Sequence, residues 1–126
     1  MVKVSRIIYI IAAWVFVTGV IIQVFLAGLV VVARQMGWET HRSFGHFWGV
    51  PILLMLITAY LARMPRSIKW LTWALFGVFI IQAEVIIFLR DSAPVLSAFH
   101  PVLALVDFAL GVRLAWKPQS EAVTFA

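Results

Sequence analysis

The chain has 126 residues, of which 64% are hydrophobic and 12% are charged. A soluble domain of this length could not bury so much apolar surface, so the composition predicts a protein of the lipid bilayer. The absence of cysteine excludes disulfides, thiolate metal sites and covalent attachment of haem. The net charge of +5 comes from basic residues that flank hydrophobic segments, so we expect no nucleic-acid partner.

Four apolar stretches are expected to span the membrane and to form one domain over residues 1–126. They cover residues 7–33, 44–62, 70–89 and 95–116. Each is near or above the ~20 residues that cross a hydrocarbon core of ~30 Å. Because the connections are short, consecutive helices should be antiparallel neighbours. The sequence therefore predicts an all-α integral membrane four-helix bundle with up-down-up-down topology.

Lys and Arg are distributed unequally between the two ends of this bundle. Three lie at one end (Arg34, Arg42 and Arg90), and seven lie at the end with both termini: Lys3, Arg6, Arg63, Arg66, Lys69, Arg113 and Lys117. Cytoplasmic loops are the richer in Lys and Arg. We therefore predict a multi-pass plasma-membrane protein with both termini in the cytoplasm. Its three histidines then lie near the outer face.

A weak internal repeat relates the two halves of the chain at an offset of 59 residues. The tripeptide Ile-Ile-Gln that ends at Gln23 recurs at Gln82, and the same offset carries His41 onto His100. The glutamine and histidine matches are informative because polar residues are scarce in this chain. A repeated two-helix unit would give the bundle a pseudo-twofold axis, with His41 and His100 facing each other from the second and fourth helices.

His41 and His100 are therefore the candidate metal ligands. Two neutral imidazoles opposed in a helical bundle can take both axial positions of a haem iron. A haem is flat and wide, so small residues are needed on the ligand's own helix face. Gly45 and Gly49 follow His41 at one-turn intervals, and Ala104 follows His100 by one turn. The alternative is that the histidines are interfacial anchors and the small residues serve helix packing.

His46 lies about 140° further round the helix than His41, at ~100° per residue. The two cannot easily bind one metal from one continuous helix, so only one of them should pair with His100. We predict that it is His41, because His41 is related to His100 by the repeat and is followed by the regularly spaced glycines. His46 is the alternate ligand, because its depth matches that of His100. Arg42 is a candidate partner for haem propionates, since a guanidinium matches carboxylate geometry, with plain solvation as the alternative.

Three further polar side chains fall within the predicted spans. Gln23 has a small residue one turn away on either side, and it either fastens helices or lines a cofactor pocket. Glu84 could orient a histidine through its second ring nitrogen. Asp107 lies two turns beyond His100 on the same face, where an acid is costly in lipid. A hydrogen bond to Gln23 and a proton-relay role are the alternatives for Asp107.

The segment Glu-Thr-His-Arg-Ser-Phe-Gly-His-Phe-Trp-Gly, from Glu39 to Gly49, resembles the start of the second helix in half of a haem A synthase. In that family an acid precedes a haem-ligating His-Arg, and regularly spaced glycines follow. Each four-helix half holds a haem between its second and fourth helices, which implies His41 and His100 here. The chain departs from the family in having four helices rather than eight. Its acid is two rather than three positions before His41, and His46 stands where Arg is more usual.

Nearly the whole chain resembles an uncharacterised bacterial family of small four-helix membrane proteins. The shared motifs are Gln with Ala-Gly in the first helix (Gln23, Ala27-Gly28), His-x-x-x-Gly-His opening the second, and His-Pro opening the fourth (His100-Pro101). This resemblance implies the fold, and the family brings no established activity with it.

Together these patterns predict a membrane cytochrome that binds b-type haem non-covalently through His41 and His100. Its expected role is electron transfer with a quinone or a respiratory-chain protein in the lipid bilayer, and a homo-oligomer is a further alternative. Two other functions stay open. One is a non-catalytic membrane subunit or interaction protein without a cofactor. The other is a small-solute or proton pathway that uses Glu84, Asp107 and Gln23. The sequence does not decide whether the protein is an enzyme.

Overall fold

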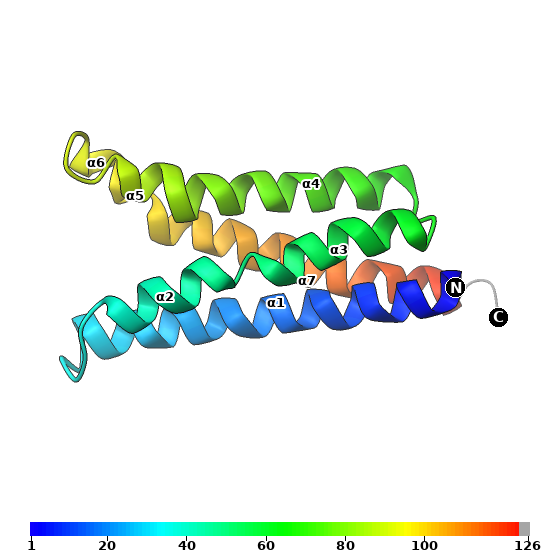
Figure 1. The fold of residues 1–126 in the computed structure, drawn as a ribbon, viewed down its shortest axis with the longest axis horizontal. Coiled ribbons are helices and arrows are strands. Elements are labelled where there is room, and N and C mark those ends of the chain that lie inside the picture. Colours follow the sequence, from blue (N-terminus) through cyan, green and yellow to red (C-terminus); the bar gives the residue numbers. More distant parts are fainter. Residues whose placement is uncertain (124–126) are drawn as a thin grey trace.

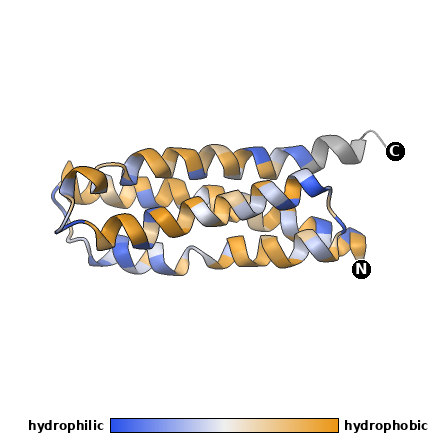
Figure 2. Cartoon of the chain, turned by 90° about the horizontal axis from the view of Figure 1, so that it is seen from above, coloured by the Kyte–Doolittle hydropathy of each residue, from blue (hydrophilic) through white to orange (hydrophobic). Residues whose placement is uncertain are grey.

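The computed structural model describes the backbone of residues 1–123 and the side chains of residues 1–117, and the regular structure in this part is all helical (Figure 1). Residues 124–126 of the predicted domain lie outside it. Four helical segments are long and apolar enough to cross a membrane: Val2–Val31, Glu39–Leu61, Arg66–Phe88 and Pro94–Lys117. Hydrophobic residues cover most of the bundle's length, and hydrophilic residues are concentrated towards its ends (Figure 2). The predicted all-α fold with four spanning-length helices is confirmed.

The second and third segments are each built from more than one helical element. The elements in chain order are α1 (Val2–Val31), α2 (Glu39–Phe47), α3 (Val50–Leu61), α4 (Arg66–Ile80), the π-helical turn η1 (Ile81–Val85), α5 (Ile86–Phe88), α6 (Pro94–Ser97) and α7 (His100–Val123). Consecutive segments run in opposite directions, so the N-terminus and the end of α7 lie at the same end of the bundle (Figure 1).

The helices pack in a ring in which sequence neighbours are also spatial neighbours. Helix α1 packs against α3 and α7, and α4 packs against the same two helices. Helices α1 and α4 are therefore diagonal to each other, as are the second and fourth segments. This is the arrangement that short connections between antiparallel helices produce.

In three segments the helix begins before the predicted span. The first helix begins at Val2 instead of residue 7, the second at Glu39 instead of residue 44, and the third at Arg66 instead of residue 70. Hydropathy marks the lipid-facing part of a helix, whereas backbone hydrogen bonding continues through the polar residues before it. As a result, His41 lies inside α2 and not in a loop before a helix.

The second and fourth segments are shaped by proline and glycine. The second segment is interrupted at Trp48 and Gly49, and Pro51 lies in the first turn of α3. The predicted fourth span, residues 95–116, agrees with the segment Pro94–Lys117. Within this segment α7 begins at His100 with Pro101 in its first turn, where a missing N–H breaks no helical hydrogen bond, and α7 continues to Val123.

The core occupies the half of the bundle that carries the termini. Its largest apolar side chains with under 2% exposure are Tyr9, Phe16, Ile52, Met55, Ile68, Leu75 and Leu114. Gly111 lets α7 approach α1, because a Cβ there would lie 3.0 Å from both the Phe16 ring and Val17. Without a hydrophobic driving force between helices in lipid, such close packing is what holds a bundle together.

A buried hydrogen bond joins the diagonal helices α1 and α4. The Tyr9 hydroxyl lies 2.7 Å from Thr72 Oγ1, which itself donates to the carbonyl oxygen of Ile68 at 2.8 Å. Tyr9 is therefore the donor, and Tyr9→Phe leaves Thr72 with its other partner. We expect this change to lower the free energy of unfolding by about 1 kcal/mol, measured by denaturant titration in mixed micelles.

The matched control for this prediction is Tyr60→Phe. Tyr60 is exposed, and its hydroxyl accepts a hydrogen bond from Trp73 Nε1 at 3.1 Å. Exposed substitutions usually change stability by less than about 0.5 kcal/mol. Equal losses in the two variants would show that the Tyr9–Thr72 bond has no special weight.

Candidate functional site

A cavity of about 580 Å³ lies between the helices, towards the end of the bundle away from the termini. It has the size of pockets that bind small molecules and cofactors. Seven of the eight predicted site residues line it: Gln23, His41, Arg42, Gly45, His46, His100 and Ala104. Most of the remaining wall is apolar and includes the aromatic rings of Phe16, Trp48, Phe79 and Phe108. Residues far apart in the chain therefore converge on one space.

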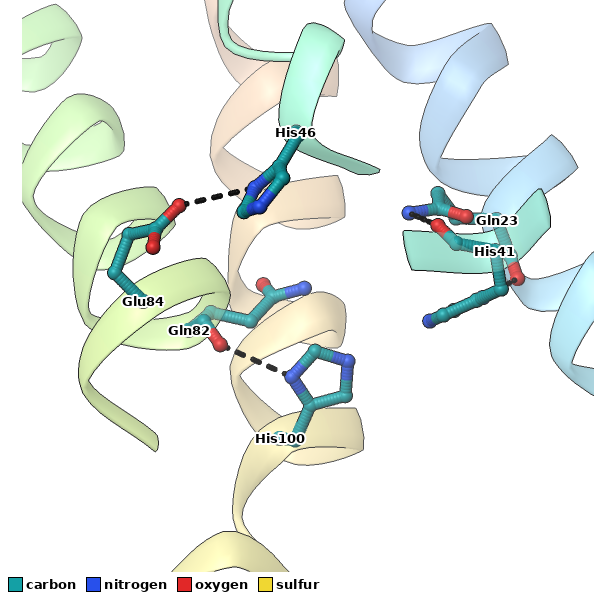
Figure 3. A network of polar contacts seen from close by, with 6 residues as sticks. All are labelled: Gln23, His41, His46, Gln82, Glu84 and His100. Atoms are coloured by element: carbon teal, nitrogen blue, oxygen red, sulfur yellow. Dashed lines mark hydrogen bonds and ion pairs between the residues drawn. The ribbon is translucent and has the colours of Figure 1, made fainter. Parts of the chain in front are cut away.

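His41 and His100 face each other across this cavity (Figure 3). His41 Nδ1 donates to the carbonyl oxygen of Gln23 at 3.2 Å, and His100 Nδ1 donates to that of Gln82 at 3.1 Å. A carbonyl oxygen can only accept, so Nδ1 carries the proton and each Nε2 keeps a lone pair. The ring centroids are 6.2 Å apart, and Figure 3 shows the Nε2 corners turned towards one another. The pair presents two nitrogen lone pairs to one space.

The two histidine contacts are equivalent under the offset of 59 residues. Each histidine donates to the carbonyl of the glutamine 18 residues before it. The glutamines lie on the diagonal pair α1 and η1, and the histidines lie on the diagonal pair α2 and α7, as a pseudo-twofold axis requires. This equivalence supports the internal repeat, which stays a prediction.

His46 is paired with Glu84 and does not lie opposite His100. Its Nδ1 is 3.2 Å from Glu84 Oε1, with the two side chains 68% and 56% exposed (Figure 3). Glu84 thus orients a histidine, which is one of the roles predicted for it. His46 lines the exposed rim of the cavity in contact with Glu84, and its role as the alternate ligand stays a prediction.

Arg42 and Gly49 relate to the cavity less directly than predicted. Arg42 Nη2 lies 3.7 Å from Glu39 Oε1, and both side chains are largely exposed, although Arg42 also contributes to the cavity lining. Gly49 does not line the cavity. It lies at the break between α2 and α3, where a Cβ would be 3.0 Å from the Phe79 ring. Its small size therefore serves contact between helices, and its predicted place in the pocket is corrected.

Four buried oxygens of cavity-lining side chains have no hydrogen-bond partner. They are Oε1 of Gln23, Oε1 of Gln82 and both carboxylate oxygens of Asp107, a residue that is only 1% exposed. The predicted bond between Asp107 and Gln23 is not formed, because Gln23 Nε2 donates to the His41 carbonyl oxygen at 3.1 Å. Buried polar groups normally have partners. All four oxygens therefore belong to side chains of the cavity wall whose hydrogen-bonding capacity the protein itself does not use.

Two residues of the wall were not among the predicted site residues. Gln82 lies in η1, where Ile86 N–H bonds the Ile81 carbonyl in π-helical register, a feature common at functional sites. Its offset from Gln23 is the signal that could have identified it. Trp48 Nε1 donates to the Phe16 carbonyl oxygen at 3.0 Å. Nothing in the sequence distinguishes Trp48 from the other tryptophans.

The donor set suits a metal carried in a macrocycle. Within the described residues, no group of three or more His, Cys, Asp or Glu side chains could hold a metal ion directly. A haem iron needs only two axial ligands from the protein, because the porphyrin fills the other four positions. His41 and His100 present two imidazole nitrogens to the cavity, which is the number of protein ligands that such a group would need.

A family model described as a family of unknown function (DUF6220) matches residues 23–87, just over half of the chain. The matched segment contains Gln23 and the motif from His41 to His46, and it ends before His100. No curated protein and no solved structure matches the chain. The match agrees with the predicted uncharacterised family, whereas the comparisons add no support for the likeness to haem A synthase.

Proposed function

We propose that this chain, which belongs to the DUF6220 family of unknown function, is a membrane cytochrome that binds b-type haem between His41 and His100. The observation that carries the proposal is the 6.2 Å separation of the two rings, whose Nε2 lone pairs face one cavity. If both rings held one metal ion, two metal–nitrogen bonds of about 2 Å and about 1 Å from each nitrogen to its ring centre would place the ring centres about 6 Å apart. The observed spacing fits this value.

The cavity wall also suits a porphyrin. Ala104 lies one turn after His100 and keeps the space beside that ring open, whereas the small size of Gly45 makes room for the Gln23 amide at the cavity wall. Apolar and aromatic side chains provide flat contacts for the macrocycle. Arg42 lies at the exposed rim, where a guanidinium can pair with a propionate. The chain has no cysteine, so the haem would be held without covalent attachment.

The chemistry we propose is electron transfer. When bound, haem supplies a one-electron couple. His41 and His100 would hold the iron from opposite sides, so the group would serve electron transfer and not binding of oxygen or substrate. The carbonyls of Gln23 and Gln82 fix the tautomer and orientation of the two rings and increase their strength as ligands.

The proposed electron partner is a membrane quinone or a respiratory-chain protein. The cavity lining includes exposed apolar side chains of α1 and α7, namely Ile21, Val24 and Leu105. One edge of the cavity therefore reaches a surface that would face lipid, where a quinone travels. We retain the orientation predicted from Lys and Arg, with both termini in the cytoplasm of a bacterium.

Absorption spectroscopy of three purified proteins tests the haem proposal. After expression with added haem, the wild type should show a Soret band and sharp α and β bands on reduction. We expect His100→Ala to lower the haem content by more than about tenfold. Removing only a hydrogen-bond partner of a metal ligand already lowers metal affinity by about 10–100-fold, and removing the ligand itself should lower it further. His46→Ala is the control and should keep both content and spectrum, since His46 is paired with Glu84. A colourless wild type, or a spectrum unchanged in His100→Ala, would refute the proposal.

A further inference from the structure

We propose that Asp107 binds a proton when the iron held by His41 and His100 gains an electron, so that the cavity couples electron uptake to proton uptake. This inference rests on the proposed function. Asp107 shares the cavity with both ligands, is 1% exposed, and has no partner for either carboxylate oxygen. A carboxylate so placed depends on distant charge for its stability, because neither water nor a donor compensates its burial.

The oxidised iron supplies that charge. An Fe(III) porphyrin core carries one positive charge that the Fe(II) core lacks, so oxidation favours the carboxylate and reduction favours the neutral acid. Asp107 follows His100 by two turns of α7, which is about 10 Å along the helix axis. At about 10 Å and an effective dielectric constant of about 20, one charge changes the proton affinity of a carboxyl group roughly tenfold.

The other ionisable groups of the cavity wall are already engaged. They belong to α2 and α7 and are His41, Arg42, His46 and His100. Within the described residues, the parts of α1, α4, η1 and α5 that line the cavity carry no ionisable side chain. Arg42 and His46 lie beside their own acids, Glu39 and Glu84, and the other two are the ligands. Asp107 is the buried group left to respond to the charge of the iron.

The step conserves charge within the cavity. When a bound haem is reduced by one electron from a quinol, or from a chemical reductant in the test, the Asp107 carboxylate would accept one proton from water and become a carboxylic acid. Below the pH range in which Asp107 titrates, it is protonated in both redox states, and above that range it is ionised in both. Only between these limits does reduction bind a proton, so the potential falls there as pH rises.

Spectroelectrochemical titration of the haem-loaded protein over a pH series tests this coupling. The wild-type potential should be about 60 mV lower above the titration range than below it, since a tenfold change corresponds to 59 mV for one electron. Asp107→Asn should remove this fall while keeping haem content and absorption spectrum. Glu84→Gln is the matched control, because it neutralises an acid that has a partner and is 56% exposed. Glu84→Gln should keep the fall in potential with rising pH. Any pH dependence of the potential that comes from the haem propionates is common to all three proteins.

Infrared difference spectra give a second readout that does not depend on the variant folding. Reduced-minus-oxidised wild-type spectra should contain the carbonyl band of a carboxylic acid that becomes protonated on reduction. The absence of this band, or equal pH dependence in the wild type and Asp107→Asn, overturns the inference and leaves haem binding intact. A colourless wild type removes both proposals.

Discussion

Replacing Ala104 with phenylalanine is expected to abolish haem binding while both ligands stay in place. Ala104 lies one turn after His100 on α7 and lines the cavity. A phenyl ring at this position occupies space beside His100 that a porphyrin needs. We expect the haem content of purified Ala104→Phe to fall at least roughly tenfold, because even modest overpacking costs about 1–3 kcal/mol. Haem extraction and quantification measure this directly.

The stability of Ala104→Phe without haem distinguishes a blocked cavity from a misfolded protein. Filling a cavity commonly raises stability by about 0.5–2 kcal/mol, so the variant should unfold no more easily than the haem-free wild type. Ala109→Phe is the matched control, since Ala109 is an exposed alanine of α7 that borders a shallow groove beside Trp14 and not the cavity. It should bind haem normally. Normal haem content in Ala104→Phe would mean that the porphyrin lies elsewhere.

The fold could be predicted well because lipid imposes a simple rule. Four apolar runs of spanning length and short connections leave little besides an antiparallel bundle. The helix ends were less predictable, since α2 begins at Glu39, in a polar stretch whose hydropathy gives no sign of a span. The break at Trp48 and the π-helical turn in η1 also have no local signal. Both depend on how neighbouring helices pack, and a single sequence does not contain that information in readable form.

The candidate site was predictable where it depended on side-chain type and spacing. Polar residues are so rare in this chain that His41, His100 and Gln23 could be singled out, and the structure brings all three to one cavity. The contacts that fix the two rings were not predictable, because they use backbone carbonyls, which every residue has. The contact between His46 and Glu84 was foreseen only as one option for Glu84.

The cavity and the core are joined at Phe16, which makes this residue the strongest test of what supports the site. Its ring is fully buried, lines the cavity and meets the Phe79 ring edge to face, with centroids 6.3 Å apart at 74°. Its carbonyl oxygen accepts the hydrogen bond of Trp48. The ring and the backbone of one residue thus hold the third segment and the interrupted second segment against α1.

Phe16→Ala is expected to lower the free energy of unfolding by about 3–5 kcal/mol, the range for emptying a large aromatic site. Lipid replaces none of the lost contacts inside the bundle, so the cavity term persists even without a hydrophobic driving force between helices. Denaturant titration of the haem-free protein in mixed micelles measures the loss. Phe25→Ala is the matched control on the same helix, where the ring is 63% exposed, and it should change stability by less than about 1 kcal/mol.

Phe16→Ala should also weaken haem binding, because it changes the cavity wall while both histidine ligands stay in place. Without the Phe16 ring the cavity widens towards the core, and the macrocycle loses a flat contact while His41 and His100 remain. We therefore expect Phe16→Ala to keep the low-spin absorption spectrum at saturating haem but to require more haem to reach it. Equal stability losses in Phe16→Ala and Phe25→Ala would mean that the packing around Phe16 does not support the bundle. In that case Phe16 would not be the residue that supports the cavity wall against which haem is proposed to bind.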